Sequence, residues 1–306
     1  MTLALLLEQL LNGVQFGVML FLMASGLTLI FGVMGLINLA HGSLYMIGAF
    51  VCAYVTGITG SFWAGLLAGA LGAAFMGVLV EVCVIRRLYN RDHLDQVLAT
   101  FALILMISEG TRWVFGSQPL WLDAPAALAG SIQLGAGLVY PLYRLLIILF
   151  GVLVAVGLYL LISRTRVGMR IRAGENDREM VDALGVNISA LYSFVFAVGA
   201  ALAGLAGSLV GALQSVEVGM GEPVLILAFV VIVIGGIGSI KGALIGSLLV
   251  GLVDTLGRVF LPTFFRLFMD SSDASSVGSA LASILIYLLM AIILALKPKG
   301  MFPVNA

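Results

Sequence analysis

Charged residues are scarce in this chain of 306 residues: Asp, Glu, Lys and Arg make up 10%, against 62% hydrophobic residues. Soluble domains carry about 25% charged residues, so the composition excludes an ordinary water-soluble domain and indicates an integral membrane protein. The 15 basic residues are balanced by 15 acidic ones. With zero net charge and arginines clustered beside apolar runs, the chain lacks the basic surface that nucleic-acid binding requires.

Cysteine, histidine and nucleotide-binding motifs are also scarce. Cys52 and Cys83 both lie inside apolar runs, so they provide no disulfide framework and no thiolate metal site. His41, the only histidine in an apolar setting, forms neither a zinc triad nor an HExxH motif with Asn38 and Ser43. A nucleophile–base pair of Ser43 and His41 is disfavoured because residues two apart diverge on a helix. No GxxxxGK[ST] loop occurs. We therefore expect no catalytic residue, no metal, and no cofactor bound by this chain.

Basic residues are absent until Arg86. The N-terminus MTLALLLEQLL therefore lacks the basic region of a removable signal peptide. Lys and Arg that flank a span stay on the cytoplasmic side of a membrane, which predicts a cytoplasmic C-terminus. The predicted cytoplasmic side receives Arg86, Arg87, Arg91, Arg164, Arg166, Arg170, Arg172, Arg178, Lys241, Lys297 and Lys299, and the opposite side only Arg112, Arg144, Arg258 and Arg266.

Long apolar runs fill most of the remaining sequence, and a polar segment that includes proline, 116–140, separates two of them. Such runs cross a bilayer as helices. The sequence predicts an all-α integral membrane protein, a polytopic bundle of about 8–10 transmembrane helices with broken or re-entrant segments. The runs are 3–31, 44–58, 63–85, 94–115, 141–162, 190–213, 224–234, 243–261 and 277–296.

Two apolar segments, 26–50 and 228–252, are interrupted midway by glycine and polar residues, GVMGLINLAHGS and GGIGSIKG. Paired interruptions in the two halves of a chain indicate an internal repeat with a pathway at its interface. Broken backbone is tolerated in the membrane only where it is buried in protein or lines a cavity. The alternative is an ordinary loop between two spans, which is equally favoured around Lys241. The candidate pathway residues are Asn38, His41, Gly42, Ser43, Gly235, Gly236, Gly238 and Ser239.

A few charges lie inside the apolar runs. Asp254 is predicted to form a structural ion pair with Arg258 at i+4, because a carboxylate in the membrane centre costs about 2.5–3.5 kcal/mol. Glu109 and Arg112 are predicted to pair in the same way. The two carboxylates near span ends, Glu8 and Glu81, are expected to reach the membrane interface.

The most polar stretch, 163–187, carries five arginines among four acidic residues. Asn176 and Glu179 have the spacing of a helix capping box, and Gly185 stands where the helix would end. Met180, Ala183 and Leu184 share one face of that helix. This pattern predicts a small amphipathic helix at the membrane surface; the simpler alternative is a solvated loop helix.

Several segments, in order along nearly the whole chain, are similar to the membrane permease subunit of ABC importers of the branched-chain amino-acid type. NLAHGS and GGIGSIKGA are the most distinctive. The stretch 174–181, GENDREMV, is more acidic than is typical of that family. The segments that carry the resemblance are 26–50, 94–107, 164–191, 196–211, 233–256 and 294–302.

This resemblance implies one transmembrane permease domain over 1–306, half of a translocation path for branched-chain amino acids or a related small solute. It implies a second homologous permease, two cytoplasmic ATPase subunits that use the ATP, and an extracytoplasmic solute-binding protein, in the bacterial cytoplasmic (inner) membrane. It also places an ATPase-coupling loop at 164–190. The expected coupling residues are Glu175, Asn176, Asp177, Glu179, Met180, Ala183, Leu184 and Gly185.

An ion-coupled secondary transporter with broken-helix repeats is the alternative. Such a protein needs a midplane carboxylate or proton relay, for which Asp254 is the one serious candidate. An intramembrane enzyme is disfavoured, since no nucleophile or metal constellation is present in the sequence.

Overall fold

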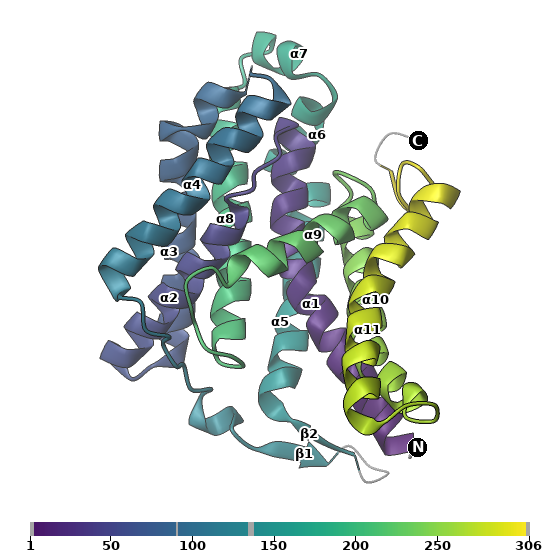
Figure 1. Cartoon of the computed structure of the whole chain (residues 1–306). Helices are drawn as coiled ribbons and strands as arrows, with labels where there is room; N and C mark the ends of the chain where they lie inside the picture. Colours follow the sequence, from purple (N-terminus) through teal and green to yellow (C-terminus); the bar gives the residue numbers. More distant parts are fainter. Residues whose placement is uncertain (1–2, 90, 134–137, 304–306) are drawn as a thin grey trace. The chain divides into compact units, whose positions relative to one another are not determined.

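The computed structural model describes residues 3–89, 91–133 and 138–303, and the side chains of four of these, 175, 176, 178 and 179, are not described. Within these ranges, eight helices are long and apolar enough to cross a membrane. The chain is therefore an all-α polytopic membrane protein, as predicted. The eight are α1 (Leu3–Met34), α2 (His41–Thr59), α3 (Phe62–Cys83), α4 (His93–Phe115), α5 (Leu142–Arg164), α8 (Ile188–Gly211), α10 (Ile240–Phe265) and α11 (Ser271–Leu296) (Figure 1).

Shorter elements connect these helices. In the described part of the chain, three of these are α-helices: α6 (Arg166–Asn176), α7 (Arg178–Ala183) and α9 (Gly221–Gly235). Two are 3-10 turns, η1 (Ile85–Leu88) and η2 (Ala126–Leu128). The polar segment 116–140 contains β1 (Ser131–Gln133), which pairs antiparallel with β2 (Val139–Pro141), with Ile132 opposite Tyr140. Both interruptions expected from the sequence are breaks in the helical backbone, at 35–40 and 236–239.

The boundaries of α10 and α11 differ from those expected. α10 continues through Pro262 to Phe265 rather than ending at 261, and α11 begins at Ser271 rather than near 277. Within this added part of α11, Ser275 and Ser276 donate their hydroxyl protons to carbonyls four residues earlier, so both hydroxyls are paired inside the helix.

The chain divides into two compact units, each built from discontinuous segments. The end unit comprises Met1–Phe21, Ala126–Val152 and Ala228–Ala306; the middle unit comprises Leu22–Pro125 and Leu153–Leu227. The first break lies in the middle unit and the second break in the end unit.

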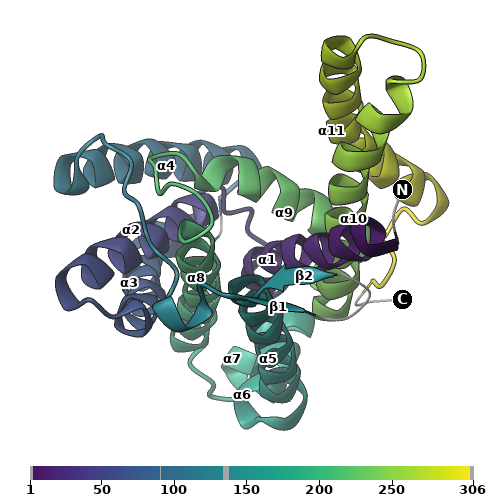
Figure 2. The ribbon, with the colours of Figure 1, turned by 90° about the horizontal axis from the view of Figure 1, so that it is seen from below.

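The core of the middle unit is a layer of three helices, α2, α3 and α8, which lie side by side in both ribbon views (Figures 1 and 2). Small residues allow this close approach. A Cβ on Gly48 of α2 would collide with the backbone of Gly204 in α8. The Ser208 hydroxyl of α8 donates to the Gly48 carbonyl at 3.0 Å. The layer therefore has little room to deform internally.

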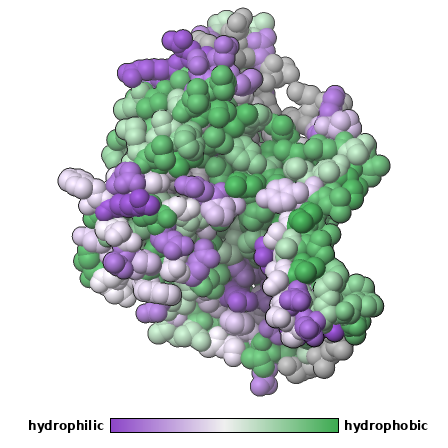
Figure 3. Space-filling model, in the orientation of Figure 1, coloured by the Kyte–Doolittle hydropathy of each residue, from purple (hydrophilic) through white to green (hydrophobic). Residues whose placement is uncertain are grey.

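In the end unit, α1 and α10 make a similar close contact through Gly17 and Gly251. On α10, Arg258 Nε donates to Asp254 Oδ1 at 2.8 Å, and the Asp254 side chain is only 8% exposed. In the middle unit, Arg112 pairs with Glu109 at 2.8 Å on the surface of α4. Both predicted ion pairs are confirmed. In Figure 3, hydrophilic residues gather at the upper end of the middle unit, where α4 begins, hydrophobic residues form a band below them, and further hydrophilic residues lie below that band.

Candidate functional site

The polar stretch predicted to be amphipathic forms two short helices, α6 and α7. Thr165 caps α6, its Oγ1 accepting from the Gly168 N–H at 3.0 Å. The next cap is Asp177, whose Oδ1 accepts from the Met180 N–H at 2.9 Å. The expected cap at Asn176 is therefore wrong by one residue, because α6 continues through Asn176 and the chain becomes extended only at Asp177. The predicted Glu175, Asn176 and Glu179 side chains lie outside those described.

The C-terminal end of α7 is as predicted. Gly185 has a φ of +83°, in the left-handed region that glycine adopts without strain. Its N–H donates to the Asp182 carbonyl at 2.9 Å, and the Val186 N–H donates to the Val181 carbonyl at 3.3 Å. These two bonds form a Schellman motif, which terminates the helix sharply.

One face of α7 is exposed on the protein surface. Val181 is buried, at 6% exposure, and anchors the helix on the protein. Met180 is 57% exposed and Leu184 75% exposed, and Ala183 is exposed beside them. Met180 and Leu184 are four residues apart and so lie on the same side of the helix. α7 thus presents the apolar surface that the sequence predicted.

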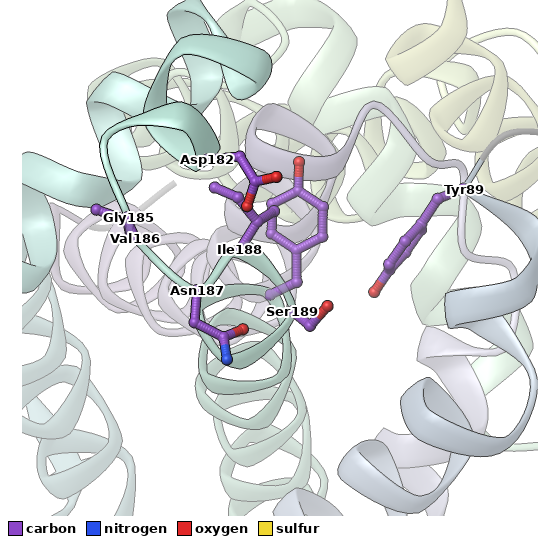
Figure 4. A pocket seen from close by; sticks show the side chains of 8 residues that line it. Tyr89, Asp182, Gly185, Val186, Asn187, Ile188 and Ser189 are labelled. Atoms are coloured by element: carbon purple, nitrogen blue, oxygen red, sulfur yellow. The ribbon is translucent and has the colours of Figure 1, made fainter.

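Beside α7 lies a pocket of about 560 Å³. Figure 4 shows Tyr89 approaching it from the segment after α3, Asp182 from α7, and Asn187 and Ser189 from the start of α8. The rings of Tyr89 and Tyr192 pack edge to face, with centroids 5.2 Å apart. The remaining lining residues are Gly185, Val186 and Ile188.

A buried carboxylate near the end of α3 adjoins this pocket. Glu81, which the sequence predicts at the membrane interface, has a side chain with 0% exposure. It accepts hydrogen bonds from Arg86 Nε (3.1 Å) and Nη2 (3.0 Å), from the Tyr89 hydroxyl (2.7 Å) and from Ser193 Oγ (2.7 Å). The hydrogen bond to Glu81 raises the pKa of Arg86, and burial together with Glu81 raises the pKa of Tyr89. Both donors therefore keep their protons at neutral pH.

The polar side chains of the first break are buried in the protein. Asn38 and His41 both have 0% exposure and Ser43 has 4%. Asn38 Oδ1 accepts from the Ala40 N–H at 3.1 Å, which shapes the turn into α2. Among the described residues, Asn38 Nδ2 and both ring nitrogens of His41 have no partner with hydrogen-bond geometry, although the Met23 carbonyl faces the imidazole. Gly42 packs against Gly221, and a Cβ on either would collide with the other's backbone.

The second break is held by the C-terminal segment, a contact that the sequence analysis did not anticipate. Gly236 and Gly238 have φ values of +103° and +81°, and Ser239 caps α10 by accepting from the Gly242 N–H at 3.1 Å. The N–H groups of Met301 and Phe302 donate to the carbonyls of residues 234 and 235, each at 2.9 Å. The segment after α11 therefore satisfies carbonyls that the end of α9 would leave unpaired. The predicted Gly235 is buried where α9 ends, against Gly242.

Comparison with known proteins shows the family to which the chain belongs. Residues 9–294 match the family described as branched-chain amino acid transport system / permease component. The chain belongs to this permease family. The permease is 32% identical over 265 residues to the high-affinity branched-chain amino acid transport system permease protein BraD of Pseudomonas aeruginosa, covering 82% of this chain and 86% of BraD.

Two further relatives carry a related name. LivH of Escherichia coli, a high-affinity branched-chain amino acid transport system permease protein, is 30% identical over 276 residues, covering 85% of the permease and 88% of LivH. A probable branched-chain amino acid transport permease protein, LivH of Methanocaldococcus jannaschii, is 27% identical over 258 residues, covering 81% of the permease and 79% of that LivH. The family match, over residues 9–294, includes both breaks and the α6–α7 segment.

Proposed function

We propose that this chain is the transmembrane permease subunit of an ATP-binding cassette importer and forms half of the translocation path for a branched-chain amino acid or a related small solute. The family match supports the class of transporter, and the names of its relatives support the solute class. The proposed setting is the bacterial cytoplasmic (inner) membrane, with the C-terminus in the cytoplasm. Because the segments of the two units interleave along the chain, we treat 1–306 as one permease domain.

The observation that carries this proposal is α7, a capped helix with exposed apolar side chains at Met180 and Leu184. An exposed apolar pair on a short, sharply terminated helix suits a protein partner, because it buries apolar area without a large ordering cost. We assign that partner as a cytoplasmic ATPase subunit. The expected coupling residues retain this role as part of the proposal: Glu175, Asn176, Asp177, Glu179, Met180, Ala183, Leu184 and Gly185.

The remaining partners follow from the same proposal. Two ATPase subunits bind and hydrolyse ATP, so this chain has no ATP site, cofactor or catalytic residue of its own. A second homologous permease completes the path, and an extracytoplasmic binding protein delivers the solute. The secondary-transporter alternative is weakened because the carboxylate it would use, Asp254, is engaged by Arg258.

The two breaks are proposed to line or gate the translocation path. The burial of Asn38 and His41 favours a gate in the conformation described, because side chains at 0% exposure contact solute only after the segment opens. The positive-φ glycines at 236 and 238 allow a comparable movement at the second break. The proposed pathway residues remain Asn38, His41, Gly42, Ser43, Gly235, Gly236, Gly238 and Ser239.

The proposal predicts ATP-driven uptake by a complex that contains this chain. The permease should co-purify from native membranes with an ATPase, and proteoliposomes holding that complex and its binding protein should accumulate labelled leucine, isoleucine or valine only when ATP is supplied. Urea, short amides and aromatic acids complete the solute panel. Uptake driven by an ion gradient without ATP would instead identify a secondary transporter.

Orientation gives a second prediction. In a variant without Cys52 and Cys83, single cysteines replace the exposed residues Asp92, Ser189 and Ala129. A membrane-impermeant thiol reagent added to intact cells should label position 129 alone, because basic residues hold the other two on the cytoplasmic side. All three positions should react in permeabilised cells. Labelling of position 189 from outside would place α7 where no cytoplasmic ATPase can reach it.

A further inference from the structure

The hydrogen-bond cluster around Glu81 joins three separate parts of the middle unit. Glu81 lies near the end of α3, Arg86 and Tyr89 lie in and just after η1, and Ser193 lies in the second turn of α8. Arg86 Nη2 also donates to Ser193 Oγ at 2.8 Å, so α8 contacts both members of the ion pair. The hydroxyl has one proton, which it donates to Glu81 at 2.7 Å; the Ser189 carbonyl, 3.0 Å away, is the alternative acceptor. The start of α8 is thereby fastened to the end of α3.

The ion pair is partly buried: the Glu81 side chain has 0% exposure and the Arg86 side chain 37%. A buried carboxylate contributes little net stability even when paired, and an apolar replacement of similar volume is often as stable. Charge-assisted hydrogen bonds do, however, impose a narrow geometry on the groups they join. Of the four donor atoms that converge on the Glu81 oxygens, three belong to the segment after α3 and one, Ser193 Oγ, belongs to α8, so the cluster joins the start of α8 to the end of α3.

The cluster also adjoins the coupling segment. Tyr89 and Tyr192 belong to the lining of the pocket beside α7, together with Asp182 and the turn that leads into α8 (Figure 4). Asn187 caps α8, its Oδ1 accepting from the Ala190 N–H at 2.9 Å. The cap at Asn187 lies six positions before Ser193, so the Glu81 contact fastens α8 less than two turns from its start.

From its start, α8 leads towards the first break. Its middle packs tightly into the α2–α3–α8 layer and approaches α1 at Gly199, where a Cβ would meet Ile30 and the Gly26 carbonyl. A Cβ on Gly26 would in turn lie 3.1 Å from His41 Nε2. Close-packed helices move as bodies rather than deforming continuously. A displacement at the start of α8 can therefore reach His41 at the first break.

We propose that Glu81 is a positioning residue for coupling: it holds the start of α8 to the end of α3. Movement that α7 transmits to the start of α8 is then delivered to the α2–α3–α8 layer as a whole. This inference rests on the proposed function, since it requires an ATPase that moves α7. It assigns no contact between Glu81 and the solute.

The test compares ATP hydrolysis with uptake in reconstituted complexes carrying Glu81→Gln. The variant should assemble and hydrolyse ATP, while the ATP consumed per leucine transported rises about fivefold, within the range typical of coupling between linked sites. Leucine is replaced by whichever solute of the panel the unmodified complex transports. Glu109→Gln is the matched control: it breaks an exposed ion pair in the same unit and should leave the ratio unchanged.

Two milder variants keep the inference testable if Glu81→Gln fails to accumulate. Ser193→Ala and Tyr89→Phe each remove one donor while leaving Glu81 paired with Arg86, and each should raise the same ratio by a smaller factor. Losses of hydrolysis and uptake that follow the amount of assembled complex would overturn the inference, as would an unchanged ratio in all three variants. Absence of ATP-driven uptake by the unmodified protein would instead refute the proposed function, before any variant is made.

Discussion

Replacing Met180 and Leu184 together with aspartate should abolish uptake while the permease still inserts into the membrane. Both side chains are exposed, Met180 on α7 and Leu184 at its C-cap, so the monomer loses no core packing. At a docked interface each contributes about 1.5–3 kcal/mol by burial, and an unpaired carboxylate in its place adds a further penalty. The double change should therefore weaken docking by about a hundredfold or more. Co-purification of the ATPase and ATP-dependent uptake measure the effect.

The control for this prediction preserves the apolar surface. The exchange Met180→Leu with Leu184→Met keeps volume and hydrophobicity nearly constant, which interfaces tolerate well. It should retain ATPase binding and most of the uptake. If the double aspartate variant still co-purifies with the ATPase and imports solute, α7 is a solvated surface helix and the partner docks elsewhere.

The long apolar helices were predictable because the bilayer sets a length and a polarity that the sequence must meet. Apolar runs of about 20 residues have few alternatives to helices, since backbone groups find no other partners in hydrocarbon. The breaks were equally visible, because glycine, Asn38 and His41 interrupt otherwise continuous runs. The ion pair of Asp254 and Arg258 followed from their i+4 spacing.

What sequence reasoning missed depends on contacts between distant segments. Glu81 finds Arg86 within five positions, a signal that was available, but Ser193 lies 112 positions away. The segment containing Met301 and Phe302 reaches the second break in the same non-local way. The capping error at α7 has a local cause: Asn176 and Asp177 are both competent caps, and the end of α6 decides between them.

The first break provides the second large expected effect: Asn38→Leu should reduce uptake per assembled complex by about tenfold or more. The change removes a buried amide donor that has no partner among the described residues, so the fold loses chiefly the Asn38–Ala40 turn contact, about 1 kcal/mol. If Asn38 meets water or solute when the gate opens, the open state loses a polar partner, about 1–3 kcal/mol. Uptake should therefore fall further than assembly.

His41→Ala distinguishes a structural role of the first break from a gating role more sharply. Ser25→Ala is its matched control. Ser25 is also fully buried near the end of α1, but its hydroxyl already donates to the Leu22 carbonyl at 3.0 Å. Removing a satisfied hydroxyl should leave uptake per complex near that of the unmodified protein. A structural His41 would lose folded protein and uptake in proportion, whereas a gating His41 loses uptake beyond that proportion. Unchanged uptake per complex in both Asn38→Leu and His41→Ala would mean that the break is architecture and that the path lies elsewhere.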